Sequence, residues 1–154
     1  MKFRMVDRIL DWERARRIRG VKGVSFEEYS LKDPFGGGER LPEMLLLESF
    51  FQLGNWLIVL STDFTRMGIV IRMGRVRFEG SLGPGETMTL EVRARRWRED
   101  AILFDGLSRV GARRIASGEG CLAVPVPLER FCDPADLRIL FGEIHRPEGR
   151  GGAW

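Results

Sequence analysis

The chain has 154 residues, of which 44% are hydrophobic and 31% are charged, and its net charge is +3. This balance argues against a disordered or a membrane-embedded chain and favours one soluble domain with a single core. The two cysteines, Cys121 and Cys132, are too few and too far apart for a disulfide framework or a paired metal motif. The first residues lack the apolar block of a secretory signal, so we expect a cytoplasmic protein.

The N-terminal third is predicted to hold a short helix, an extended segment and a loop. Residues 6–18, VDRILDWERARRI, have apolar side chains at irregular helical spacing and predict the helix. Residues 20–30, GVKGVSFEEYS, place β-branched and aromatic side chains between glycines and predict extended structure. Residues 31–40, LKDPFGGGER, must form a loop, because a proline and a glycine run disfavour both helix and strand.

A long buried helix is predicted from Pro42 to about Ser61. Proline suits the first helical position, and an acidic residue directly after it favours the positive end of the helix dipole. Apolar side chains lie on nearly all faces of the run EMLLLESFFQLGNWLIVLS, so this helix is expected in the core. Its polar stripe, Glu48, Gln52 and Asn55, follows helical spacing and lies on one side. An apolar core of about 17 residues that contains a carboxylate is too short and too polar for a good membrane span.

After the helix, the pattern changes to about four antiparallel strands. Residues 87–97, TMTLEVRARRW, alternate between apolar and polar side chains, which is typical of a strand with one face exposed to water. Residues 68–78, 101–110 and 114–124 supply the neighbouring strands. The predicted class is α+β, with an antiparallel sheet wrapped around the long helix. A domain at residues 1–125 is followed by an extension at 126–154, with a helix starting near Pro134 and a mobile tail from about residue 147.

The motifs in this order resemble the hot-dog-fold 3-hydroxyacyl-(acyl-carrier-protein) dehydratases of the FabZ and FabA type. That family has an opening like VDRV, a KNVS segment, a loop with GHFP, and then MPGVLxxExxxQ on its central helix. Here MVDRIL, VKGVSFEE, DPFGG and LPEMLLLESFFQ follow in the same order, and GRVRFEGSLGPGE resembles a later family segment. The resemblance covers roughly residues 3–125.

The resemblance implies a dimer with an acyl tunnel at its interface, where a histidine of one subunit and a carboxylate of the other act on a β-hydroxyacyl thioester. Glu48 matches the family's carboxylate and is the candidate catalytic residue. The segments that match the loop and the helix start carry the candidate substrate-binding residues, which are Pro34, Phe35, Leu41, Met44 and Gln52. No metal or organic cofactor is implied, since the substrate's phosphopantetheine arm arrives with its carrier.

The family's histidine is not retained at its expected place. Pro34 stands at that position, and the only histidine of the chain, His145, lies in the C-terminal extension. General acid–base catalysis is worth about 10² to 10⁴-fold per group, so we predict that this chain alone is not a sufficient dehydratase. A second departure is Glu43, which replaces the glycine at the start of the family's helix.

The predicted function is therefore binding of 3-hydroxyacyl or enoyl thioesters on acyl carrier protein or coenzyme A. Three alternatives for Glu48 stay open. In the first, Glu48 is a retained residue held by hydrogen bonds in a structural or non-catalytic binding protein. In the second, it completes a hetero-oligomeric dehydratase whose other subunit supplies the histidine. In the third, it activates water in an acyl thioesterase, with help from Asp33 or Glu39.

The expected partners follow from the same resemblance and from the arginine content. Arg72, Arg75 and Arg77 lie in the strand region after the helix and are candidates for contact with an acidic acyl carrier protein. A solvated strand face explains the same residues without a partner. A homodimer or a larger assembly of dimers is expected. Nucleic acid is not, because no basic motif interleaved with aromatic residues is visible.

Overall fold

The computed structural model describes residues 4–27 and 39–147. Several predictions fall partly or wholly on the remaining residues, among them the last three residues of the extended segment predicted at 20–30. The loop that contains Pro34 and Phe35 lies outside the described residues, apart from its last two positions, and so does nearly all of the predicted C-terminal tail.

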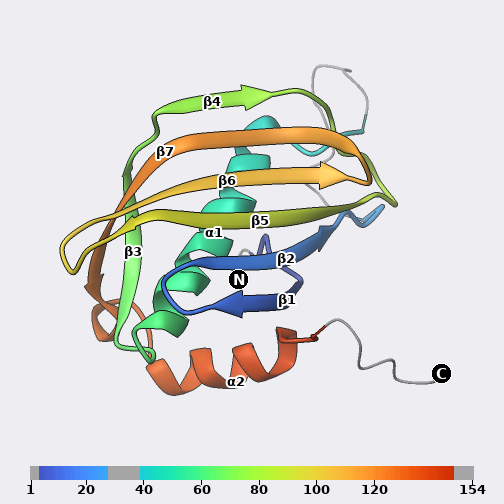
Figure 1. The fold of residues 1–154 in the computed structure, drawn as a ribbon. Coiled ribbons are helices and arrows are strands. Elements are labelled where there is room, and N and C mark those ends of the chain that lie inside the picture. The colour runs from blue at the N-terminus through green and yellow to red at the C-terminus, as the bar shows by residue number, and fades with distance from the viewer. Residues whose placement is uncertain (1–3, 28–38, 148–154) are drawn as a thin grey trace.

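Helix α1, Glu43–Ser61, runs behind the sheet through the centre of the fold, as Figure 1 shows. Pro42 is its N-cap residue and Glu43 lies in its first turn, so the predicted start is confirmed. Leu46, Phe50 and Leu53 are completely buried on its sheet-facing side. Among the described helices, α1 alone is long and apolar enough to cross a membrane, but 61% of its most apolar window is buried inside the protein.

One antiparallel sheet wraps around α1. Its strands are β1 (Arg8–Glu13), β2 (Arg17–Gly23), β3 (Arg66–Arg72), β4 (Arg75–Phe78), β5 (Thr87–Trp97), β6 (Ile102–Val110) and β7 (Arg113–Pro127). The order across the sheet is β1-β2-β5-β6-β7-β3, and β4 also pairs with β7. The prediction of an α+β hot-dog fold, with a sheet wrapped around one long helix, is confirmed.

The prediction of a helix at residues 6–18 is wrong. This segment forms β1, the turn after it and the start of β2. The hairpin is stabilised by ion pairs across it: the Arg17 guanidinium lies 2.6 Å from Asp11 and 2.8 Å from Glu13. β2 also pairs with β5 along its whole length. These contacts outweigh a local spacing that suits a helix as well as a strand.

Within the part of the chain that the structure describes, the strands after α1 number five rather than about four. The segment predicted as one strand divides at Gly74 into β3 and β4, and both pair with β7. A Cβ atom on Gly74 would lie only 2.5 Å from the carbonyl oxygen of Glu119, so the backbones approach closely at this point. The alternation predicted for residues 87–97 is confirmed, since Met88, Leu90 and Val92 of β5 are all buried.

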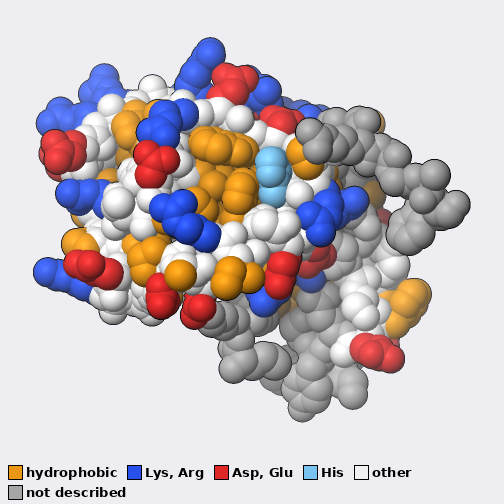
Figure 2. All heavy atoms as spheres, turned by 90° about the horizontal axis from the view of Figure 1, so that it is seen from below, with side chains coloured by type: hydrophobic (Ala, Val, Ile, Leu, Met, Phe, Trp, Pro, Cys, Tyr) orange, Lys and Arg blue, Asp and Glu red, His pale blue; other side chains and the backbone are white. Residues whose placement is uncertain are grey.

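The predicted C-terminal helix is present as α2, Pro134–Ile144, after a short 3-10 turn at Leu128–Arg130. Asp133 caps it by accepting a hydrogen bond of 2.8 Å from the Ala135 amide. The helix lies below β1 and beside one end of α1 in Figure 1. Figure 2 shows that face of the molecule, where hydrophobic side chains gather in the middle and charged ones surround them.

Candidate functional site

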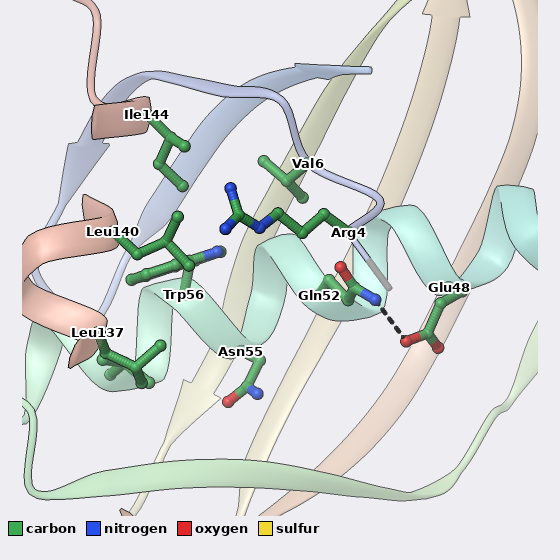
Figure 3. A pocket seen from close by; sticks show the side chains of 10 residues that line it. Arg4, Val6, Glu48, Gln52, Asn55, Trp56, Leu137, Leu140 and Ile144 are labelled. Atoms are coloured by element: carbon green, nitrogen blue, oxygen red, sulfur yellow. Dashed lines mark hydrogen bonds between the residues drawn. The ribbon is translucent and has the colours of Figure 1, made fainter. Parts of the chain in front are cut away.

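The polar stripe of α1 is the centre of the candidate site. The Gln52 side chain lies between two partners: its amide nitrogen donates to Glu48 Oε1 at 2.9 Å, and its oxygen accepts from the Met5 amide at 2.8 Å. The Met5 amide can only donate, so it fixes which end of the Gln52 side chain faces Glu48. A carboxylate therefore receives an oriented hydrogen bond on one oxygen, as the dashed line in Figure 3 shows.

The third residue of the stripe, Asn55, contacts a different part of the structure. Asn55 Oδ1 accepts a hydrogen bond of 2.8 Å from the Gly68 amide of β3. In Figure 3 its side chain points away from Gln52, toward the strand that passes below α1. Asn55 thus ties the edge strand to the helix, whereas Glu48 and Gln52 form a separate pair.

Glu48 is half-buried, and its second carboxylate oxygen is available. Among the described residues, the only hydrogen bond to this carboxylate comes from Gln52, on Oε1. An oxygen that lines a cavity without a protein partner can accept a hydrogen bond from a ligand or from water. The arrangement is suited to proton transfer or to orientation of a hydroxyl group.

Two cavities meet at this stripe, and Glu48, Gln52 and Asn55 line both of them. The first has a volume of about 310 Å³ and extends toward α2. Its apolar wall consists of Val6, Trp56, Val59, Leu137, Leu140 and Ile144, and the Arg4 side chain extends across it in Figure 3. The second cavity, of about 540 Å³, extends the other way and is lined by Phe51 and by β3.

The other residues predicted to bind substrate are spread apart. Leu41 is 2% exposed and belongs to the core, where its amide donates to the Leu82 carbonyl at 2.7 Å. Met44 is 63% exposed on the first turn of α1. Neither lines the two cavities, whereas Gln52 lines both. The roles predicted for Leu41 and Met44 stay predictions, and Pro34 and Phe35 lie outside the described residues.

His145 stands apart from the Glu48–Gln52 pair. It follows the last residue of α2 and stacks on Phe141 with ring centroids 4.7 Å apart. It is not among the described residues that line either cavity. The described residues also contain no group of three or more histidine, cysteine, aspartate or glutamate side chains placed to hold a metal ion.

The three arginines predicted to contact a carrier protein are all exposed, and one of them lines the second cavity. Arg72 ends β3 and lines that cavity, while Arg75 and Arg77 lie on β4. Arg75 forms a loose ion pair of 3.8 Å with Glu119. Contact of these arginines with a carrier protein stays a prediction.

The cavity wall that α2 provides was not predicted from the sequence. Leu137, Leu140 and Ile144 recur at helical spacing and could have been recognised as one apolar face. Their spacing does not say which surface that face meets. The sequence likewise does not indicate that Trp56 lines a cavity, because α1 is apolar on nearly all sides.

Comparison with known proteins identifies the family. The model of the FabA-like domain matches residues 1–119. The chain belongs to the FabA-like domain family. This FabA-like chain is 31% identical over 128 residues to the 3-hydroxyacyl-(acyl-carrier-protein) dehydratase FabZ of Moorella thermoacetica, which covers 82% of the chain and 90% of the relative. It is 33% identical over 111 residues to the FabZ of Pectobacterium atrosepticum, covering 70% of the chain and 74% of the relative.

Solved structures similar to this FabA-like chain share its fold. The fluoroacetyl-CoA thioesterase FlK has a TM-score of 0.63 and 15% identity, with 84% of this chain and 98% of that chain covered. A Streptococcus mutans protein bound to acetyl-CoA has a TM-score of 0.61 and 12% identity, with 78% and 88% covered. At such identities these likenesses concern the fold alone.

Proposed function

We propose that this protein binds 3-hydroxyacyl or enoyl thioesters of acyl carrier protein or coenzyme A in the cleft around Glu48. The observation that carries the proposal is the Glu48 carboxylate, which is oriented by Gln52 and keeps one oxygen available in an otherwise largely apolar cavity. Such a cavity, with a few convergent polar groups, is the usual form of a small-molecule site. The dehydratases that the chain resembles act on thioesters of this class by name.

A second part of the proposal concerns assembly. β3 is an edge strand of the described sheet, and Ile69, Ile71 and Met73 at this edge are 40%, 59% and 44% exposed. An apolar edge strand left open is a hazard that proteins usually cover. We infer that two copies pair through this edge, and that the partner then closes the second cavity over Glu48.

The chemistry of the site depends on which group works with Glu48. Pro34 stands where the resemblance places a histidine, and proline has no proton to exchange. We propose that the homodimer binds its thioester without efficient dehydration, and that a histidine-bearing subunit of the same family restores the reaction. An acyl thioesterase is the second candidate, because the available oxygen of Glu48 is suited to activate water.

One experiment distinguishes thioester binding, dehydration with a partner subunit, and thioester hydrolysis. The purified protein is incubated with a series of 3-hydroxyacyl and acyl thioesters of acyl carrier protein and coenzyme A, with Glu48→Gln as the matched variant. Thioester binding is measured by native mass spectrometry, dehydration by enoyl product, and hydrolysis by free thiol. Each measurement is repeated after co-expression with a histidine-bearing dehydratase subunit.

We expect binding by both forms, and enoyl product only in the co-expressed complex with an intact Glu48. Thiol release that Glu48→Gln abolishes would instead identify a thioesterase. Enoyl formation by the protein alone would contradict the inferred need for a partner. Absence of thioester binding under every condition would overturn the proposed function.

A further inference from the structure

Helix α2 closes one end of the first cavity, opposite the Glu48–Gln52 pair. Leu137, Leu140 and Ile144 project from one face of α2 toward α1 and the N-terminal segment, as Figure 3 shows. Trp56 of α1 completes this end of the cavity. The cavity therefore has the Glu48–Gln52 pair at one end and the apolar side chains of α2 and Trp56 at the other, with the Arg4 side chain extending between them. An acyl thioester likewise has a polar end and an apolar end.

We propose that α2 sets the length of the acyl group that the protein accepts, with Leu140 and Trp56 as the residues that limit it. This inference rests on the proposed function, since it assumes that the thioester lies near Glu48 and that its acyl chain enters the first cavity. The cavity volume of about 310 Å³ lies at the lower end of the range of about 300 to 1,000 Å³ for small-molecule sites. The preferred acyl groups are therefore short.

The apolar wall can limit the acyl-chain length only if it keeps its position. Contacts along the whole length of α2 hold this helix in place. Asp133 caps its first turn. In the middle, Arg138 lies 4.3 Å from the centroid of the Phe64 ring and donates to the Asp63 carbonyl at 2.9 Å. At the end, His145 forms a β-bridge to Ile9, and the Arg146 amide donates to the Ile9 carbonyl at 2.9 Å.

Aromatic contacts hold α2 against α1 and against the turn that follows α1. The Phe141 ring lies 6.0 Å from that of Trp56 and 6.2 Å from that of Phe64. The matched FabA-like region ends at residue 119, so the whole of α2 lies outside it. The proposed length limit thus depends on a helix that lies outside the matched region.

The test is a chain-length series. Binding constants of saturated acyl-CoAs from butyryl to dodecanoyl are measured by calorimetry for the wild type, Leu140→Ala and Leu140→Phe. Ile139→Ala is the matched control, because Ile139 lies on the same helix and is 65% exposed. Thermal unfolding of each variant confirms that it is folded, and Leu140→Met gives a second form that keeps the side-chain volume.

For the wild type, affinity is expected to rise about fourfold per added methylene while the chain is being buried, and then to stop rising at the length where the chain meets α2. Leu140→Ala should move this limit to longer acyl groups, and Leu140→Phe should move it to shorter ones. Leu140→Met and Ile139→Ala should leave it in place.

The result that would overturn the inference is a limit that stays the same in Leu140→Ala and Leu140→Phe, or one that Ile139→Ala moves equally. In either case binding itself would still support the proposed function. If no acyl-CoA binds the folded wild type, the proposed function fails and the length limit fails with it. The two failures are therefore distinguishable in one set of titrations.

Discussion

The two sides of α1 have very different surroundings. On the side that faces the sheet, Phe50 is completely buried, and its ring lies against Gly106 and Gly118, where no side chain would fit without a shift. On the other side, Glu48 and Gln52 border two cavities and share a single hydrogen bond. The closely packed side determines the fold, while the open side leaves room for a ligand. Substitutions on the two sides should accordingly affect different properties.

The largest effect is expected from Phe50→Ala on the packed side. Its ring contacts Phe51 edge to face at a centroid distance of 5.1 Å and fills the space above two glycines. Loss of a buried phenylalanine side chain costs about 3 to 5 kcal/mol, because a cavity replaces it. Urea unfolding should show this loss. A cost below about 1 kcal/mol would mean that the sheet-facing side of α1 is packed no more closely than the side that borders the cavities.

A second contrast separates the two cysteines. Cys121 is buried in β7, and burial, together with the nearby Asp105 carboxylate, raises the pKa of its thiol to about 11. Cys132 is half-buried beside the start of α2. The raised pKa reduces the thiolate fraction of Cys121 near neutral pH about a hundredfold, so iodoacetamide should modify Cys132 first.

Peptide mass spectrometry of the native protein measures this difference, and Cys132→Ser isolates the slower site. The folded pKa lies above that of the unfolded chain, so the Cys121 thiol stabilises the fold fully below about pH 9. That contribution is lost as the pH rises toward 11. Equal modification of both cysteines at neutral pH would contradict the close packing around β7.

Gly106→Ala should destabilise the packed side more moderately. The added Cβ atom would lie 2.5 Å from a carbon of the Phe50 ring, and overpacking of this kind costs about 1 to 3 kcal/mol. In a Phe50→Leu background the same substitution should cost less, because the smaller side chain leaves space. A double-mutant cycle on urea midpoints measures the coupling, and strictly additive effects would refute the contact.

Some parts of this structure could be predicted from the sequence and others could not. The long helix and β5 were predictable because their apolar residues repeat with a clear period. β1 was not, because its apolar positions suit a helix as well, and the ion pairs of Arg17 that favour the hairpin exist only after folding. The spacing of Glu48 and Gln52 predicted their contact. The α2 wall was not predictable, since helical periodicity does not specify which surface a helix packs on.

On the open side, the two members of the Glu48–Gln52 pair should differ in their effect on stability, and Glu48→Gln should have the smallest effect of all these substitutions. Gln52→Ala removes the acceptor for the amide of Met5, a residue that is 1% exposed, and such a loss costs about 1 to 3 kcal/mol. Glu48→Gln keeps an oxygen that can accept from Gln52 and should change stability by no more than about 0.5 kcal/mol. Urea unfolding of both variants tests this difference. If Glu48→Gln costs as much as Gln52→Ala, Glu48 is a structural residue, and its place beside the cavities would no longer indicate a site. If it costs almost nothing, the fold does not require the carboxylate, and its presence on the open side must be explained by what it binds.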